Sequence, residues 1–207
     1  MNPSPPERTN LSFNTIISST LLFGKPEYRV HASILSVTLS LHCIFFIHRV
    51  TDICQQVKTG AMVTNPFTAA IKALKTTGAS PIALVTPYRA EINMQMKEHF
   101  EEEGIKVNAI ISFNEDNDNK VGRISSDSIE KAALEIGQRT DVNGVFLSCT
   151  NLRFAKRVEA LEKKLGKPVT SSNHALAWHI LTLLGTGIPN AGWGSLFDHM
   201  PDATQQD

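Results

Sequence analysis

Two patterns of apolar and polar positions, one typical of strands and one typical of helices, alternate along the chain from about residue 61 onward. Short runs rich in apolar residues, the pattern of buried parallel strands, lie at 81–87, 106–113, 144–149 and 167–172. Stretches whose apolar residues recur every three or four positions, the pattern of amphipathic helices, lie at 65–78, 89–103, 128–140, 152–166 and 173–185. Strands that alternate with crossover helices predict an α/β fold, in which helices cover both faces of a parallel sheet.

Two helical segments repeat the same order of residues. Residues 62–78 (MVTNPFTAAIKALKTTG) and 168–185 (PVTSSNHALAWHILTLLG) both run from Val-Thr through a polar cap into an apolar helix that stops at glycine. Cys43 precedes the first Val-Thr by the same distance as Cys149 precedes the second. The repeat predicts two related lobes that face each other, each with one thiol. The alternative is that any two αβ units share such a pattern by chance.

The apolar stretch at 30–47 is at the lower edge of the length that a membrane span needs. Ser, Thr and the two histidines His31 and His42 interrupt it, so we expect no span. The first ten residues lack the charge-then-apolar order of a signal peptide. These features predict a cytoplasmic protein.

The composition narrows the choice of partners and cofactors. Twenty basic and twenty acidic residues cancel and no Lys/Arg run occurs, so we expect no nucleic acid and no anionic membrane as partner. The three cysteines, Cys43, Cys54 and Cys149, lack CxxC spacing, which argues against a disulfide framework and a zinc site. No GxGxxG or GxxxxGK[ST] motif indicates a nucleotide. We therefore expect neither a metal nor a cofactor.

The apolar run at 144–149 ends in Cys149 and turns at once into polar residues. Ligands of parallel α/β sheets collect outside the carboxyl ends of the strands. Three polar stretches follow predicted strands there: 86–88, 148–151 and 170–173. The predicted helix after Cys149 would favour its thiolate, and the N–H groups of that helix, with Thr150 and Asn151, would bind a carboxylate. The alternative is a small apolar residue that closes a strand.

Other polar residues near the strand ends have two interpretations. Tyr88 either donates a hydrogen bond to a developing oxyanion or packs with its hydroxyl satisfied. The residues expected to cap helices rather than bind a ligand are Asn65, Ser171, Ser172 and Asn173. His174 and His179 are too far apart on a helix to form a metal pair, so we expect core or surface histidines.

The motifs LVTPY (84–88) and FLSCTNLR (146–153), taken together, resemble the aspartate/glutamate racemase superfamily. The resemblance lies in the branch that holds maleate cis-trans isomerases, arylmalonate decarboxylases and ectoine-utilisation proteins. The segments that fit the ectoine-utilisation proteins best are NPFTAAIKAL (65–74), GKPVTSSNHALAWHILTLLG (166–185) and GWGSLF (192–197). The resemblance extends over residues 51–197.

The resemblance implies a cofactor-independent enzyme of two Rossmann-like lobes with parallel sheets and pseudo-two-fold symmetry. An N-terminal lobe of residues 1–78, completed by 182–207, would face a C-terminal α/β lobe of residues 79–181. Members of the superfamily open with an apolar strand that this chain lacks, so we expect about 30 to 50 residues of the first lobe to be lost or replaced. A small carboxylate is the expected partner, and assembly into a homo-oligomer is left open.

The resemblance also implies roles for residues of the second lobe. Cys149 matches the second-lobe cysteine that handles a proton or adds to the carbon skeleton. Tyr88 matches the tyrosine that binds the oxyanion. Thr150 and Asn151 match the turn that binds the substrate carboxylate.

In the first lobe, the resemblance makes Asn14 of SFNT (12–15) a substrate ligand, and Cys43 is the candidate for the first thiol. The leading hypothesis is a racemase or cis-trans isomerase that acts next to a carboxylate. The alternatives are an arylmalonate-type decarboxylase that uses Cys149 alone and a degenerate, inactive member of the family. A Cys-His hydrolase that uses His174 ranks last, because no orienting acid stands at a recognisable spacing.

Overall fold

A parallel sheet of four strands in the order β2-β1-β3-β4 organises the described structure. The computed structural model describes residues 62–188 and 192–200 of the 207-residue chain. The strands are β1 (Ile82–Thr86), β2 (Val107–Ser112), β3 (Gly144–Leu147) and β4 (Val169–Ser171). β1 pairs with β2 on one side and with β3 on the other, so Ile82 lies between Val107 and Gly144. The prediction of an α/β fold with a parallel sheet is confirmed.

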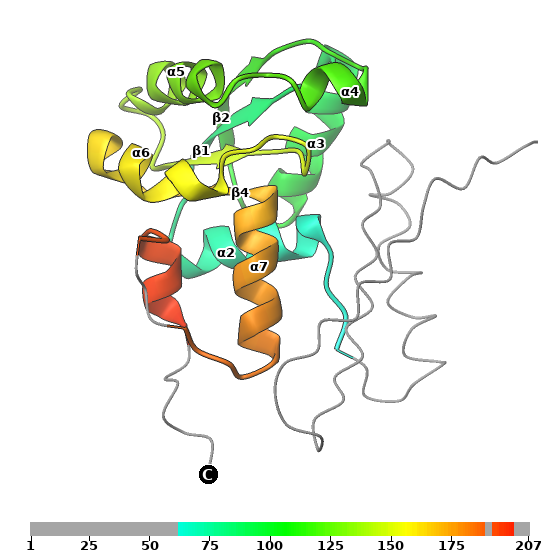
Figure 1. The fold of residues 1–207 in the computed structure, drawn as a ribbon. Coiled ribbons are helices and arrows are strands. Elements are labelled where there is room, and N and C mark those ends of the chain that lie inside the picture. Colours follow the sequence, from blue (N-terminus) through cyan, green and yellow to red (C-terminus); the bar gives the residue numbers. More distant parts are fainter. Residues whose placement is uncertain (1–61, 189–191, 201–207) are drawn as a thin grey trace, which may run out of the picture. The chain divides into compact units, whose positions relative to one another are not determined.

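Helices cover both faces of this sheet, with α2 and α3 on one face and α5 and α6 on the other (Figure 1). The helices are α2 (Pro66–Thr76), α3 (Ala90–Glu102), α4 (Asp118–Val121), α5 (Ser126–Gly137), α6 (Val158–Leu165) and α7 (Ser172–Leu183), with the 3-10 helices η1 (Ala155–Arg157) and η2 (Ser195–His199). Ala83 and Val85 of β1 pack toward α5 and α6. Ile82 and Leu84 pack toward α2 and α3. Because successive side chains of a strand point to opposite faces, β1 is buried on both.

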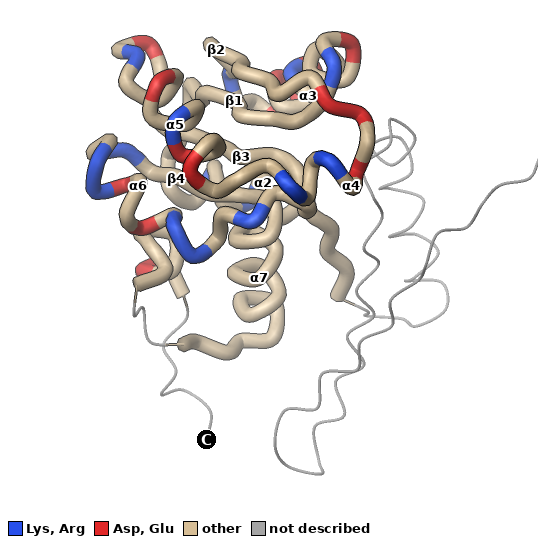
Figure 2. The backbone as a smooth tube through the Cα atoms, turned by 45° about the horizontal axis from the view of Figure 1, so that its top comes forward, with Lys and Arg blue, Asp and Glu red and all other residues tan. Residues whose placement is uncertain are grey.

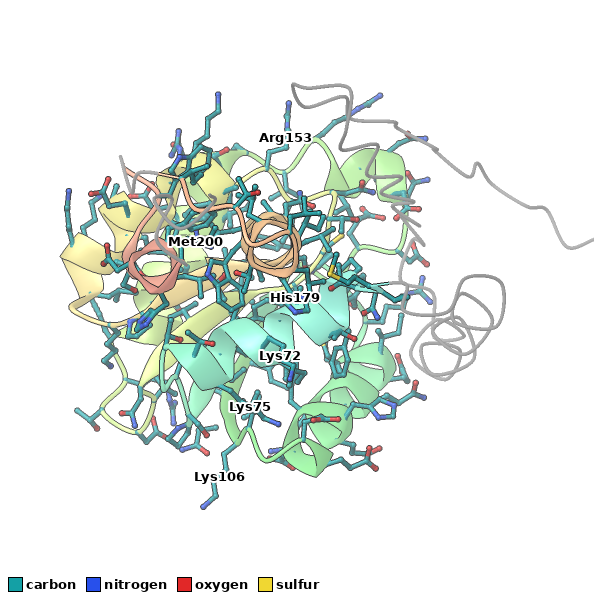
Figure 3. The ribbon with its side chains drawn as sticks, turned by 90° about the horizontal axis from the view of Figure 1, so that it is seen from below. Lys72, Lys75, Lys106, Arg153, His179 and Met200 are labelled. Atoms are coloured by element: carbon teal, nitrogen blue, oxygen red, sulfur yellow. The ribbon has the colours of Figure 1, made fainter. Side chains whose placement is uncertain are left out.

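The two helices of the sequence repeat, α2 and α7, lie side by side. Ala69 and Ala73 of α2 and Ala175 of α7 are fully buried, and such small side chains let two helices approach closely. Thr64 Oγ1 and His179 Nδ1, 2.7 Å apart, tie the segment before α2 to α7. Figure 3 views this helix pair from below, with His179 labelled on α7 and Lys72 on α2.

The helix predicted at 152–166 begins later than its apolar periodicity suggests. α6 begins at Val158, after η1, whereas Leu152 and Phe154 are buried by a turn. In that turn the Leu152 N–H donates to the Cys149 carbonyl oxygen over 3.1 Å. Two apolar residues that a turn buries therefore have the same spacing in the sequence as the first apolar residues of a helix.

Several predictions concern parts of the chain that lie wholly or partly outside the described residues. They are the N-terminal lobe of 1–78 completed by 182–207, its pseudo-two-fold relation to 79–181 and the residues that it lacks; these stay predictions. The apolar stretch at 30–47 also lies outside. Within the described residues, no helix combines the length and the apolar character that a bilayer span requires.

Candidate active site

The candidate site lies where the strand order reverses. The chain passes from β1 to β2 on one side and then crosses to β3 on the other side of β1. The carboxyl ends of β1 and β3 therefore form the crevice in which doubly wound sheets bind ligands. Tyr88 follows β1 and Cys149 follows β3, and the two side chains lie close enough that each shifts the pKa of the other. The structure thus brings together the two residues that the sequence indicates most strongly.

A cavity of about 230 Å³ lies against this pair. Its volume is below the roughly 300 to 1,000 Å³ of sites for drug-sized ligands, so it suits a small molecule. The predicted site residues Tyr88, Cys149, Thr150 and Asn151 all line the cavity. The sequence did not single out the other lining residues, which are Arg89, Ile92, Glu115, Asp116, Asp118 and Val121.

Cys149 is held in an unusual backbone conformation. Its backbone φ is 138°, in the region that favours glycine. Cys149 is buried, with 5% of its surface exposed. Its N–H donates to the Ser172 hydroxyl over 3.1 Å, and the Asn151 N–H donates to its sulfur over 3.4 Å. Such conformations cost about 1 to 3 kcal/mol and persist where the surroundings hold them, often at functional sites.

The Cys149 thiol is favoured over the thiolate, contrary to the expectation from a following helix. Burial raises the pKa of Cys149, and the negative charge of Asp118 adds to this rise. Hydrogen bonds from Tyr88 and from the N–H groups of Asn151 and Leu152 oppose the rise in the pKa without cancelling it. Because α6 begins only at Val158, its N-terminus does not follow directly after Cys149 as the sequence suggested. At neutral pH the site therefore holds a proton on sulfur.

Hydrogen bonds to its backbone fix the position of Tyr88. Its carbonyl oxygen accepts from Asn93 Nδ2 over 2.9 Å and from the Ser112 hydroxyl. Its N–H donates to Thr86 Oγ1 over 3.2 Å. Burial raises the pKa of Tyr88, and the nearby Cys149 raises it further. The phenol thus stays protonated and can donate a hydrogen bond to an oxyanion.

The turn after Cys149 offers further donors to an anion. Asn173 Nδ2 donates to the Thr150 carbonyl oxygen over 2.8 Å, which orients this peptide. Among the described residues, the Thr150 N–H has no acceptor. Asn173 and Ser172, which we expected to act as caps, instead fasten the turn that carries Cys149. Asn65 and Ser171 do cap α2 and α7, as predicted.

His174 does not act as a base toward Cys149. It is buried, its Nδ1 lies 2.9 Å from Thr170 Oγ1, and its Nε2 lies 2.7 Å from the Trp193 carbonyl oxygen. With both ring nitrogens engaged, His174 is a core histidine whose hydrogen bonds are satisfied, which leaves the Cys-His hydrolase without its base.

In the described ranges, no group of three or more His, Cys, Asp or Glu side chains is placed to hold a metal ion.

The acidic residues of the cavity come from the loop between β2 and α4 and from the first position of α4. This loop follows the carboxyl end of β2, so the rule that identified Tyr88 and Cys149 applies to it as well. The sequence NEDNDNK has the composition of a solvated loop, and for this reason the sequence did not identify its acidic residues as part of the site.

Asn14 and Cys43, the expected residues of the first lobe, lie outside the described residues.

The amino-acid sequence is similar to those of known enzymes. The family model described as arylmalonate decarboxylase matches residues 46–197. The chain is 25% identical over 168 residues to the arylmalonate decarboxylase of Bordetella bronchiseptica, covering 80% of this chain and 70% of that one. It is 29% identical over 150 residues to the maleate isomerase of Geobacillus stearothermophilus, covering 70% of this chain and 58% of that one.

A solved structure with the same fold is the Nocardia farcinica maleate cis-trans isomerase bound to TRIS. Its TM-score is 0.68 at 27% identity, and the match covers 73% of this chain and 63% of that chain. The chain therefore spans less than two thirds of the length of these two maleate isomerases.

Proposed function

Because the chain belongs to the arylmalonate decarboxylase family, we propose that it is an enzyme that acts on a small carboxylic acid through the Cys149 thiol. The observation that carries this proposal is the placement of Tyr88 and Cys149 on one cavity at the reversal of strand order. Isomerase or racemase chemistry next to the carboxylate is the leading form of the proposal.

In this proposal the turn after Cys149 binds the substrate carboxylate. The free Thr150 N–H and the Asn151 side chain donate to one carboxylate oxygen, and the Tyr88 hydroxyl donates to the other. These donors stabilise the enediolate that forms when the carbon next to the carboxylate loses a proton or a second carboxylate. The donors are positioned by hydrogen bonds before substrate arrives, so little reorganisation is needed during the reaction.

Cys149 then acts as the proton donor. In racemisation, a base on the opposite face removes the proton from carbon, and the electrons of the C–H bond enter the enediolate. The Cys149 S–H gives its proton to carbon, and the resulting thiolate recovers a proton in the reverse turnover. We propose Cys43 as the opposite base, which the resemblance to the racemase superfamily suggests.

The protonated state of Cys149 favours a second candidate, decarboxylation. In this reaction the bond from carbon to one carboxylate breaks, carbon dioxide leaves, and the bonding electrons enter the enediolate. Cys149 S–H protonates the carbon, and water restores the thiol. A thiol that is neutral at rest is ready for this step, whereas addition of sulfur to a double bond, as in cis-trans isomerisation, begins from a thiolate.

Deuterium transfer tests the proposal. Full-length protein is incubated in deuterated water with phenylmalonate, maleate and aspartate, and products are followed by NMR and mass spectrometry. Decarboxylation, isomerisation or exchange at carbon should fall by about three orders of magnitude or more in Cys149→Ser, within the range that removal of a proton donor produces. A folded wild-type protein that is silent on every substrate would favour an inactive family member instead.

Cys43→Ser separates the two candidate reactions. A two-thiol racemase or isomerase should lose activity in this variant, whereas a decarboxylase that uses Cys149 alone should retain it. Tyr88→Phe removes only the phenolic donor and should lower kcat by about ten- to a thousandfold in either case. Circular dichroism of each variant checks that the fold is kept.

A further inference from the structure

One wall of the cavity carries acidic side chains that the proposed chemistry does not use. Glu115, Asp116 and Asp118 line the cavity together with Cys149. Glu115 and Asp116 belong to the loop that leads into α4 and Asp118 begins α4, where Figure 2 shows a run of acidic positions. Arg89 is the one basic side chain among the described lining residues. A cavity that binds a substrate with two carboxylates would be expected to have more basic than acidic side chains in its lining.

Two of these carboxylates are neutralised by neighbours. Arg89 Nη2 forms a salt bridge with Asp116, and Lys120 Nζ lies 3.5 Å from a carboxylate oxygen of Glu115. Within the described part of the chain, no ion pair joins Asp118 to a basic residue. Asp118 therefore leaves one uncompensated negative charge on the cavity wall.

This charge acts on the two residues at the centre of the site. Asp118 contributes to the raised pKa of Cys149 and to the raised pKa of Tyr88. A negative charge that disfavours the thiolate and the phenolate also disfavours an anionic substituent of the substrate at the same place, and it attracts a cationic one. The substrate carboxylate is bound by the separate donors of Thr150 and Tyr88, so the effect falls on the second substituent.

We propose that Asp118 is a specificity-determining residue that selects a substrate with an ammonium group on the carbon next to the carboxylate, an α-amino acid, over a dicarboxylate. The inference rests on the proposed function, because it takes the donors of Thr150 and Tyr88 as the carboxylate site. Asp118 is exposed, so water and salt screen its charge and the preference is about tenfold rather than thousandfold.

Three ligands with a common phenyl group and carboxylate isolate this effect. Phenylglycine, 2-phenylpropionate and phenylmalonate differ only in the third substituent, which is an ammonium, a methyl or a second carboxylate. Each is added to full-length protein, and the rate of Cys149 alkylation by neutral iodoacetamide is followed by mass spectrometry of the Cys149 peptide. The ligand concentration that halves this rate gives a dissociation constant without requiring turnover.

For the wild type, phenylglycine should protect Cys149 at about tenfold lower concentration than phenylmalonate, with 2-phenylpropionate between them. Asp118→Asn should remove this preference, Asp118→Lys should reverse it, and 0.5 M salt should weaken it in the wild type. Asp141→Asn, which removes one charge from an exposed aspartate that does not line the cavity, should leave the preference unchanged.

The outcomes separate this inference from the proposed function. Equal protection by all three ligands, or a preference that survives Asp118→Asn, would overturn the role of Asp118 while the carboxylate site stands. Protection by none of the ligands would overturn the carboxylate site itself, and the inference with it. Comparing each variant with its own ligand-free rate removes the change in thiol reactivity that the loss of the Asp118 charge causes.

Discussion

The N–H of Cys149 donates a hydrogen bond to the hydroxyl of Ser172, 3.1 Å away and 23 positions later in the chain. Both residues are buried. The bond joins the end of β3 to the first residue of α7, and it holds Cys149 at its φ of 138°. The proposed proton donor is thus positioned by the neighbouring strand-helix junction as well as by its own turn.

Ser172→Ala should loosen this arrangement. The Cys149 N–H would remain buried without an acceptor, which lowers the free energy of unfolding by about 1 to 3 kcal/mol. Movement of the sulfur should reduce kcat by about ten- to a hundredfold with a smaller change in KM. Urea denaturation and steady-state kinetics measure the two effects.

Ser171→Ala is the matched control for this variant. Ser171 caps α7 through a hydrogen bond from the His174 N–H, and its hydroxyl is not the acceptor of the Cys149 N–H. Its loss should lower the free energy of unfolding by about 1 kcal/mol, as for other N-caps, and leave the rate of Cys149 alkylation unchanged. Equal kinetic losses in the two variants would show that Ser172 has no special role.

The positive φ of Cys149 predicts an unusual order of stability among its replacements. Glycine adopts this backbone conformation without strain, whereas alanine keeps the strain and loses the sulfur contacts. Cys149→Gly should therefore have a free energy of unfolding about 1 kcal/mol higher than Cys149→Ala, in urea denaturation. The reverse order would indicate that the backbone at this residue is relaxed.

The pH dependence of Cys149 alkylation should follow its raised pKa. Burial raises the pKa of Cys149 above the ordinary value of about 8.5, so the alkylation rate should reach its midpoint above that pH. Tyr88→Phe removes a hydrogen bond that lowers the pKa of Cys149 and should move the midpoint higher. Asp118→Asn should move it lower. A midpoint at or below 8.5 in the wild type would contradict the buried neutral thiol.

His174 should make the fold sensitive to acid. Burial lowers the pKa of His174 below its ordinary value, and the hydrogen bond to the Trp193 carbonyl oxygen and the charge of Glu162 only partly oppose this. Its contribution to stability is complete above about pH 6.5 and is lost as the pH falls through the lower folded-state pKa. His174→Gln should flatten the decline of the unfolding free energy between about pH 7 and 5. An unchanged slope would assign the decline to other groups.

The sequence predicted the strands and the pair at the site because both depend on local pattern. Four apolar runs identify the strands, and the rule for carboxyl ends of parallel strands then selects Tyr88 and Cys149. The start of α6 was placed too early, because Leu152 has the spacing of a helical apolar face although a turn buries it. Local periodicity does not distinguish these two ways of burying a side chain.

The acidic wall and the support of Cys149 were missed for a different reason. Asp118 begins the short helix α4 within a segment whose composition is that of any solvated turn, and only the packing of the chain brings it to the cavity of Cys149. Ser172 reads as a helix cap in the sequence, and its bond to Cys149 spans two strands. Such contacts between distant segments leave no signal in residue spacing.

The fixed position of Cys149 has a stereochemical consequence. An enediolate is planar and can accept a proton on either face. With its N–H bound to Ser172 and its sulfur accepting from the Asn151 N–H, Cys149 presents its S–H to the cavity from one direction. A decarboxylation completed by this thiol alone should therefore yield one enantiomer in excess, and chiral chromatography of the product from a prochiral malonate would reveal its handedness.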